Sequence, residues 1–244
     1  RAKSDLLKQR QTLGVQLFAL QESDQMSMEQ FRVLLEREQS VTGRVTGKFT
    51  TQLINTSEEV EKATGISAKS LRAVMTQVIA DTEVFGNVLP EQAATIAATL
   101  HGLKVDFRDL QSLVSRTQSF EGAADAAHML AMGFNASIDP VQLMRLSLTD
   151  QAAALQLVRD ALIQAGHSTQ SLSRDLPRQN ALMNIFGASS TDFGLRLLDQ
   201  SVAIDDLMTA AGEASATAAD KSTASLDQLR DDISLTGKDV GKAE

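Results

Sequence analysis

The residues that could do chemistry in this 244-residue chain are few and widely spaced. The three histidines, His101, His128 and His167, lie far from one another, and none stands at a short metal-ligand spacing. His101 and His167 flank glycines, so we expect each to satisfy carbonyl groups at a helix end. His128 lies in an alanine-rich segment, where we expect a partly buried structural role. The histidine spacing therefore predicts no metal site.

Carboxylate and nucleophile patterns do not assemble a catalytic set. The pairs Asp205-Asp206 and Asp231-Asp232 would suit glycoside hydrolysis only if two carboxyl groups faced each other across a bond. Adjacent residues on a helix do not face each other, so we expect both pairs to be solvated helix surface. No serine lies in a Gly-x-Ser-x-Gly motif, and the chain has no cysteine. We predict that the chain is not an enzyme and uses no cofactor.

The segment from Gly43 to Lys48 superficially resembles a phosphate-binding loop. It has one residue too few between its glycines, and Phe49 stands where a magnesium-binding hydroxyl should be. No strand precedes it. We interpret residues 41–48 as a hinge or a bent helix, because two glycines and four β-branched residues interrupt the helical pattern there.

Composition excludes several classes of protein. The net charge of −8 argues against broad DNA binding, which needs a basic surface. The only aromatic residues are phenylalanines, which argues against a surface that stacks on sugars or bases, and the lack of cysteine excludes a disulfide-stapled fold. No apolar run approaches the roughly 20 residues that span a bilayer. The chain starts at Arg1 without an initiator methionine, so we expect a processed chain or a fragment.

The elements that must position these residues are helices. Proline is rare and long alternating β-branched runs are absent, so we predict an all-α fold with no β-sheet. We expect a coiled-coil-like helical segment with a hinge over residues 1–48 and a bundle or array of short amphipathic helices over 49–210. A polar tail rich in alanine, serine and threonine follows over 211–244, and we expect it to be either a flexible connector or one weakly amphipathic helix that needs a partner.

An apolar column recurs every seven residues in the first segment, and a few apolar residues accompany it one turn away. A capping box at Ser27 would divide this seam between two helices. Whether the segment is one helix or two, this apolar seam needs a partner helix, so we predict a homo-oligomer. The predicted self-association residues are Leu6, Leu13, Leu17, Leu20, Phe31, Leu34 and Val41.

Glycines divide the middle region into short helices, because a left-handed helix end favours a residue without a side chain. The expected joints are Gly65, Gly86, Gly102, Gly133, Gly166 and Gly187. Helices are expected to begin at Ser67, Pro90, Asp106, Phe120, Pro140 and Thr149, with two more over 168–185 and 189–208.

The stretch from Phe49 to Met208 resembles the helical region of phage tail tape measure proteins. In that family short Gly-Ile-Ser/Ala-x-x-Leu segments repeat, as in Gly65-Ile66-Ser67-Ala68-Lys69-Ser70-Leu71, echoed by Gly187-Ala188-Ser189-Ser190-Thr191-Asp192-Phe193. The resemblance implies a virion structural protein made in the host cytoplasm and located in the tail interior. It would act in tail assembly and length determination, with itself and tail tube or baseplate proteins as partners.

Two other classes stay open. A cytoplasmic helical signalling or scaffold module of the chemoreceptor kind would show a sustained antiparallel hairpin of mirrored heptads. An enzyme would need an apolar pocket with converging polar groups in the middle array.

Overall fold

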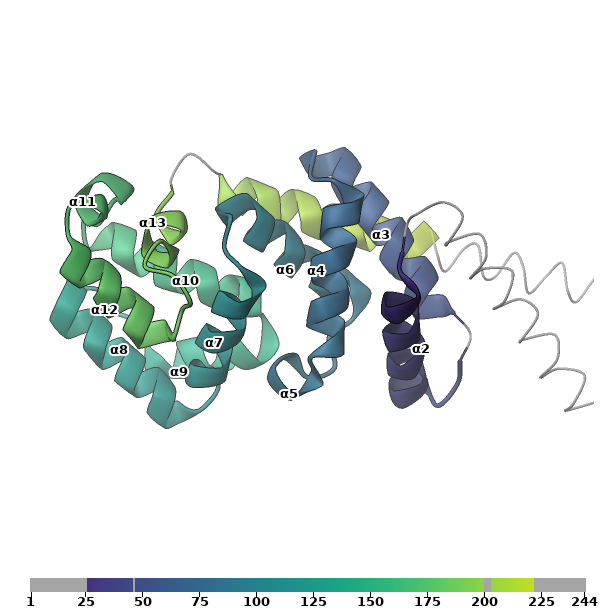
Figure 1. The fold of residues 1–244 in the computed structure, drawn as a ribbon, viewed down its shortest axis with the longest axis horizontal. Coiled ribbons are helices and arrows are strands. Elements are labelled where there is room, and N and C mark those ends of the chain that lie inside the picture. The colour runs from purple at the N-terminus through teal and green to yellow at the C-terminus, as the bar shows by residue number, and fades with distance from the viewer. Residues whose placement is uncertain (1–25, 46, 200–202, 222–244) are drawn as a thin grey trace, which may run out of the picture.

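A computed structural model describes residues 26–45, 47–199 and 203–221, and within these ranges the chain is helical and forms no strand (Figure 1). The all-α prediction is confirmed. Leu6, Leu13, Leu17 and Leu20 lie outside the described residues, so the coiled-coil arrangement stays a prediction.

The first group of helices, named the α2–α6 group, occupies one end of the molecule (Figure 1). Helix α4 packs against α3 and α6, and α2 packs against α3 and α4. The bounds are α2 Met28–Thr42, α3 Lys48–Thr64, α4 Ala68–Ala80, α5 Thr82–Phe85 and α6 Pro90–Leu103.

The second group, named the α7–α13 group, forms the other end. Helix α8 packs against α7, α9 and α12, and α12 packs against α13. Its bounds are α7 Phe107–Thr117, α8 Phe120–Phe134, α9 Pro140–Thr149, α10 Gln151–Gln164, α11 Thr169–Ser173, α12 Leu176–Phe186 and α13 Phe193–Leu197. The two groups touch where α5 meets α7 and where α6 meets α10.

A last helix, residues 204–221, runs across both groups. Near its start Gln156 of α10 donates a hydrogen bond to Asp205, and at its end Lys221 lies 3.1 Å from Glu59 of α3. Ala211, Ser215 and Ala218 are buried along it. The predicted composition boundary at residues 210 and 211 therefore falls inside a packed helix.

The predicted apolar faces form the core. Leu71, Met75, Val78 and Ile79 of α4 are buried in one hydrophobic cluster that extends from Met26 to Ala211. The hydrophobic effect drives this burial, because side chains at i, i+4 and i+7 share one face of a helix.

Several predicted helix ends are confirmed. The capping box is present, with Ser27 accepting from the Gln30 amide and the Gln30 side chain accepting from the Ser27 amide. The interruption between α2 and α3 is also present, and Gly43 there has φ +71. Gly65, Gly86, Gly166 and Gly187 all have positive φ at or just after helix ends, as expected.

Gly102 and Gly133 are not joints, which corrects the glycine interpretation. Both lie inside helices, and the left-handed residues that end these helices are Lys104 (φ 54) and Asn135 (φ 53). Asparagine tolerates this conformation better than most residues. The helix end is set by where the next segment turns into the core, and that point falls two residues beyond each glycine.

The expected helix starts and spans need three further corrections. Thr149 ends α9, and the side chain of Asp150, not Thr149, accepts from the Ala153 amide at the start of α10. The span 168–185 divides into α11 and α12, because the Asp175 carboxylate caps a new helix that has proline in its first turn. In the described part of the span 189–208, residues 189–199 and 203–208, the structure shows α13 and the start of helix 204–221.

Candidate binding site between α4 and α7

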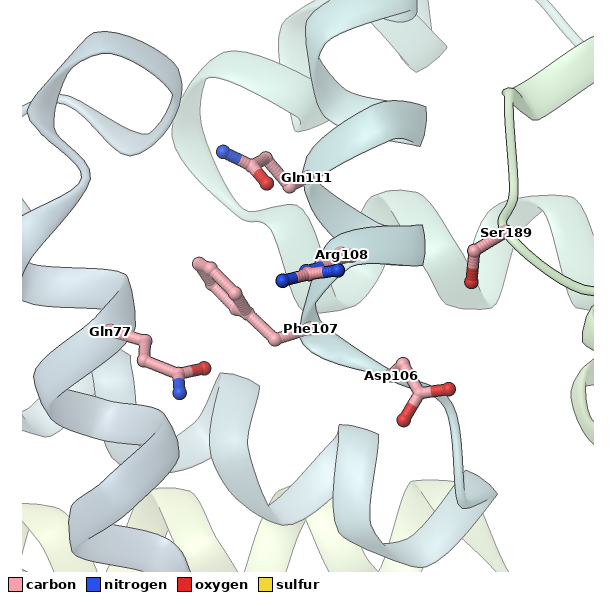
Figure 2. A pocket seen from close by; sticks show the side chains of 6 residues that line it. All are labelled: Gln77, Asp106, Phe107, Arg108, Gln111 and Ser189. Carbon is pink, nitrogen blue, oxygen red and sulfur yellow. The ribbon is translucent and has the colours of Figure 1, made fainter.

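A surface hollow of about 600 Å³, here named the α4–α7 hollow, lies where the two helix groups face each other (Figure 2). Three segments line it: α4, the first two turns of α7 with the residue before them, and the chain after α12. The lining residues are Gln77, Asp106, Phe107, Arg108, Gln111 and Ser189.

The helix patterns explain why these side chains reach the hollow. Gln77 is on the exposed face of α4, opposite the buried Val78 and Ile79. Phe107 begins α7 and stacks on Phe85 of α5, with ring centroids 5.4 Å apart and planes at 28°. This aromatic pair joins the two helix groups, and Figure 2 shows the Phe107 ring between Gln77 and Arg108.

A buried carboxylate holds the third segment in place. Asp109 of α7 is 1% exposed, and its Oδ1 accepts hydrogen bonds from the backbone N–H of Ser189 at 2.6 Å and from its hydroxyl at 2.8 Å. Because the Ser189 hydroxyl donates to Asp109, its oxygen presents acceptor lone pairs to the surroundings.

The charges in the hollow are unevenly paired. The Asp106 carboxylate lies 3.4 Å from the Arg196 guanidinium, which also donates to the backbone carbonyl of Lys104. Arg108 is exposed and forms no hydrogen bond or ion pair within the described part of the chain. The guanidinium of Arg108 is therefore unpaired among these residues, although the carboxylates of Asp81 and Asp109 lie behind the lining residues Gln111 and Ser189.

The two amides in the hollow offer both donors and acceptors. Gln111 donates from Nε2 to Asp81 Oδ2 at 2.7 Å, which leaves its carbonyl oxygen to accept. The Gln77 side chain forms no hydrogen bond among the described residues, so it presents a donor and an acceptor. The hollow therefore suits a ligand that has a carboxylate and, beside it, donors and acceptors like those of a peptide unit.

The predicted self-association residues fall in different environments. Phe31 and Leu34 are 6% and 0% exposed in the hydrophobic core of their own chain, while Val41 is exposed on α2. Phe31 and Leu34 therefore need no second chain to be buried. The other predicted residues of the seam lie outside the described ranges.

The histidines serve no common site. His167 hydrogen-bonds to the backbone carbonyl of Phe134 at 2.7 Å, so it satisfies a helix end as expected, though the end belongs to α8 rather than to its own helix. His101 is exposed, and its side chain makes no hydrogen bond within the described ranges, so the capping expected of it is not observed. His128 is exposed rather than partly buried.

The loop that superficially resembles a phosphate-binding loop already holds an anion from its own chain. Glu38 of α2 is 1% exposed, and its carboxylate accepts from the backbone N–H of Gly47 at 2.8 Å and of Lys48 at 3.1 Å. These amides begin α3, where the helix dipole favours negative charge. Their role is to join α2 to α3.

Asp205, of the carboxylate pair Asp205-Asp206, has an acidic neighbour in Asp160. Burial raises the pKa of the Asp160 carboxyl, and the nearby charge of Asp205 raises it further, whereas Arg159 lowers it. Asp231-Asp232 lies outside the described residues. No group of three or more metal-binding side chains is present in the described ranges.

No described helix is both long enough and apolar enough to cross a membrane. In the comparisons with known proteins, no family model, no curated protein and no solved structure matches this chain.

Sequence reasoning missed the α4–α7 hollow. Asp106 and Ser189 were expected only at the starts of helical segments, and Gln77, Arg108 and Gln111 carried no expectation. Neutral amides at the surface of amphipathic helices have no characteristic spacing, so no signal in the sequence marks them. Only the packing of three distant segments brings them together.

Proposed function

We propose that the chain is a structural virion protein, a phage tail tape measure-like scaffold that acts in tail assembly and length determination. The proposal includes a location in the tail interior, self-association, and contacts with tail tube or baseplate proteins. It rests on the resemblance of residues 49–208 and on how the described helices are held together.

The observation that carries the proposal is the use of buried ionisable side chains. Glu38 binds backbone amides at the start of α3, and Arg37 donates to the backbone carbonyl of Gly86 at 2.7 Å. Arg159 donates to the carbonyls of Leu197 and Asp199. Each of these groups joins one helix to the backbone of another segment, so the short helices form one connected array.

Length determination requires an extended form. A continuous helix rises 1.5 Å per residue, so the whole chain would reach roughly 370 Å, several times more than a packed array. We therefore propose that the array opens during tail assembly, and that its short helices join end to end.

The test is tail length in the virus that encodes the chain. As a continuous helix, residues 120–149 would span about 45 Å. We expect their deletion to shorten the tail by about that length and their duplication to lengthen it equally, as measured by electron microscopy. Tails of normal length in both variants would contradict the proposal. If the deletion yields no tails, the duplication still decides.

A further inference from the structure

We propose that the α4–α7 hollow binds an extended, acidic segment of a partner polypeptide. The inference rests on the proposed function only for the kind of partner, another tail protein. The chemistry of the ligand comes from the hollow itself.

The guanidinium of Arg108, not the overall charge of the hollow, favours a ligand that carries a carboxylate. Asp106 is offset by Arg196 at 3.4 Å, whereas Arg108 has no partner within the described residues. A carboxylate placed against Arg108 would form the charge-assisted, two-pronged hydrogen bonds that a guanidinium favours. An aspartate or glutamate side chain is the simplest group that supplies one.

The neutral groups select a polypeptide in extended form. Gln77 offers an amide donor and acceptor, Gln111 a carbonyl oxygen, and Ser189 a hydroxyl oxygen. The backbone N–H and C=O groups of an extended segment are free to bind such partners, while those of a helix are already satisfied internally.

The shape favours a polypeptide over a small molecule. Small-molecule sites are mostly apolar and enclose the ligand, with a few polar groups. The α4–α7 hollow has one aromatic ring, Phe107, and is otherwise lined by polar side chains, of which Gln77, Asp106, Arg108 and Ser189 are exposed. Arginine and aromatic residues are enriched at protein–protein contacts, and the hollow has one of each, Arg108 and Phe107.

A peptide titration of the full chain tests this inference. The probe is a short blocked peptide with a central glutamate flanked by serine and glycine, and the reference peptide has glutamine in place of the glutamate. We expect saturable binding of the glutamate peptide in an NMR titration, with the amide signals of residues 106–111 and 189 shifting most. Binding should weaken as salt is added.

Two variants and a matched control locate the contact. Arg108→Gln should weaken binding of the glutamate peptide by about fivefold, as for an exposed ion pair at the strong end of its range. Gln77→Ala should weaken binding of both peptides. Arg145→Gln is the control, because Arg145 is an exposed arginine on α9 that does not line the hollow.

Several outcomes would overturn the inference. These are an absence of saturable binding, equal affinity for the two peptides, or equal losses in Arg108→Gln and Arg145→Gln. Acetate binding at the same residues as tightly as the peptide would show that the hollow takes a small carboxylate instead. Tail lengths do not enter this test, so the inference and the proposed function can fail separately.

Discussion

Single buried residues connect segments that lie apart in the sequence. Glu38 satisfies two backbone amides of α3, and Asp109 holds Ser189, which lies 80 positions further along the chain. A buried polar group stabilises a fold only when it is hydrogen-bonded, and removing one partner leaves the other unsatisfied. These contacts therefore predict large effects from small substitutions.

Replacing Glu38 tests the link between α2 and α3. We expect Glu38→Gln to lower the free energy of unfolding by about 1–3 kcal/mol, because an amide binds the Gly47 and Lys48 N–H groups more weakly than a carboxylate does. Urea denaturation measures the change. The control Glu36→Gln removes an exposed charge from the same helix and should change stability by less than about 0.5 kcal/mol. Equal effects would contradict the role assigned to Glu38.

The contribution of Asp160 to the free energy of unfolding should depend on pH with the opposite sign to that of an ion-paired aspartate. Its folded pKa is raised, chiefly by burial, so the folded state holds the proton more tightly than the unfolded state does. Stability attributable to this group is present in acid. It falls as pH rises from the ordinary aspartate pKa to the raised one.

Asp160→Asn should therefore be more stable than the parent chain at pH 7, with the difference shrinking in acid below the ordinary aspartate pKa. Denaturation at a series of pH values measures this. The control Asp125→Asn, an exposed residue on α8, removes the same charge and should show no such pH-dependent gain. A gain for Asp160→Asn that grows in acid would show the sign to be wrong.

At the scale of the element, individual residues determine where a helix ends. Gly187 ends α12 with φ +65, and a Cβ there would lie 2.6 Å from Nε of Arg116. Arg116 in turn donates to the backbone carbonyls of Asn184 and Ile185. The positive φ is what requires glycine at this joint, because the guanidinium is the end of a flexible side chain and can move aside.

Two glycine substitutions with opposite expected signs test this interpretation. Gly187→Ala should destabilise the protein by more than about 1 kcal/mol, because alanine is strained at positive φ. Gly133→Ala should stabilise it by about 0.5–1 kcal/mol, because Gly133 lies inside α8 with open space at its Cβ position. Thermal or urea unfolding compares them. A loss of stability in Gly133→Ala would contradict the placement of this glycine inside the helix.

At the scale of the whole molecule, two helix groups share one core, and helix 204–221 spans them. The groups meet through few contacts, among them the Phe85–Phe107 pair and the hydrogen bond from Gln111 to Asp81. The α4–α7 hollow lies at this junction. A segment bound there would contact both groups and so restrain their relative position.

The predicted seam concerns how whole chains associate. We expect Leu13→Asp combined with Leu20→Asp to reduce oligomerisation, because a charge in an apolar seam opposes helix pairing. Light scattering with small-angle X-ray scattering measures mass and shape. An unchanged solution mass would rule out the seam.

Leu34→Ala provides the contrast to the seam variant. Leu34 is 0% exposed in the core of its own chain, so its truncation should cost about 2–5 kcal/mol of stability and leave the solution mass unchanged.

The sequence by itself determined the helical class, the apolar face of α4 and many helix ends. These features depend on neighbours within about one helical turn, as at the Ser27 capping box and at Pro90. One local signal was missed. Asp175 caps α12 and so divides α11 from α12 inside a span that was expected to be a single helix.

Only the tertiary structure decided which residues meet at a site. The α4–α7 hollow joins Gln77, the first two turns of α7 and Ser189, and the burial of Glu38 and Asp109 depends on the backbone groups that face them. Periodicity shows which face of a helix is apolar, but not which distant segment covers it. Which segment covers a given face depends on how all the helices pack together, because a face that is covered by one helix cannot also be covered by another.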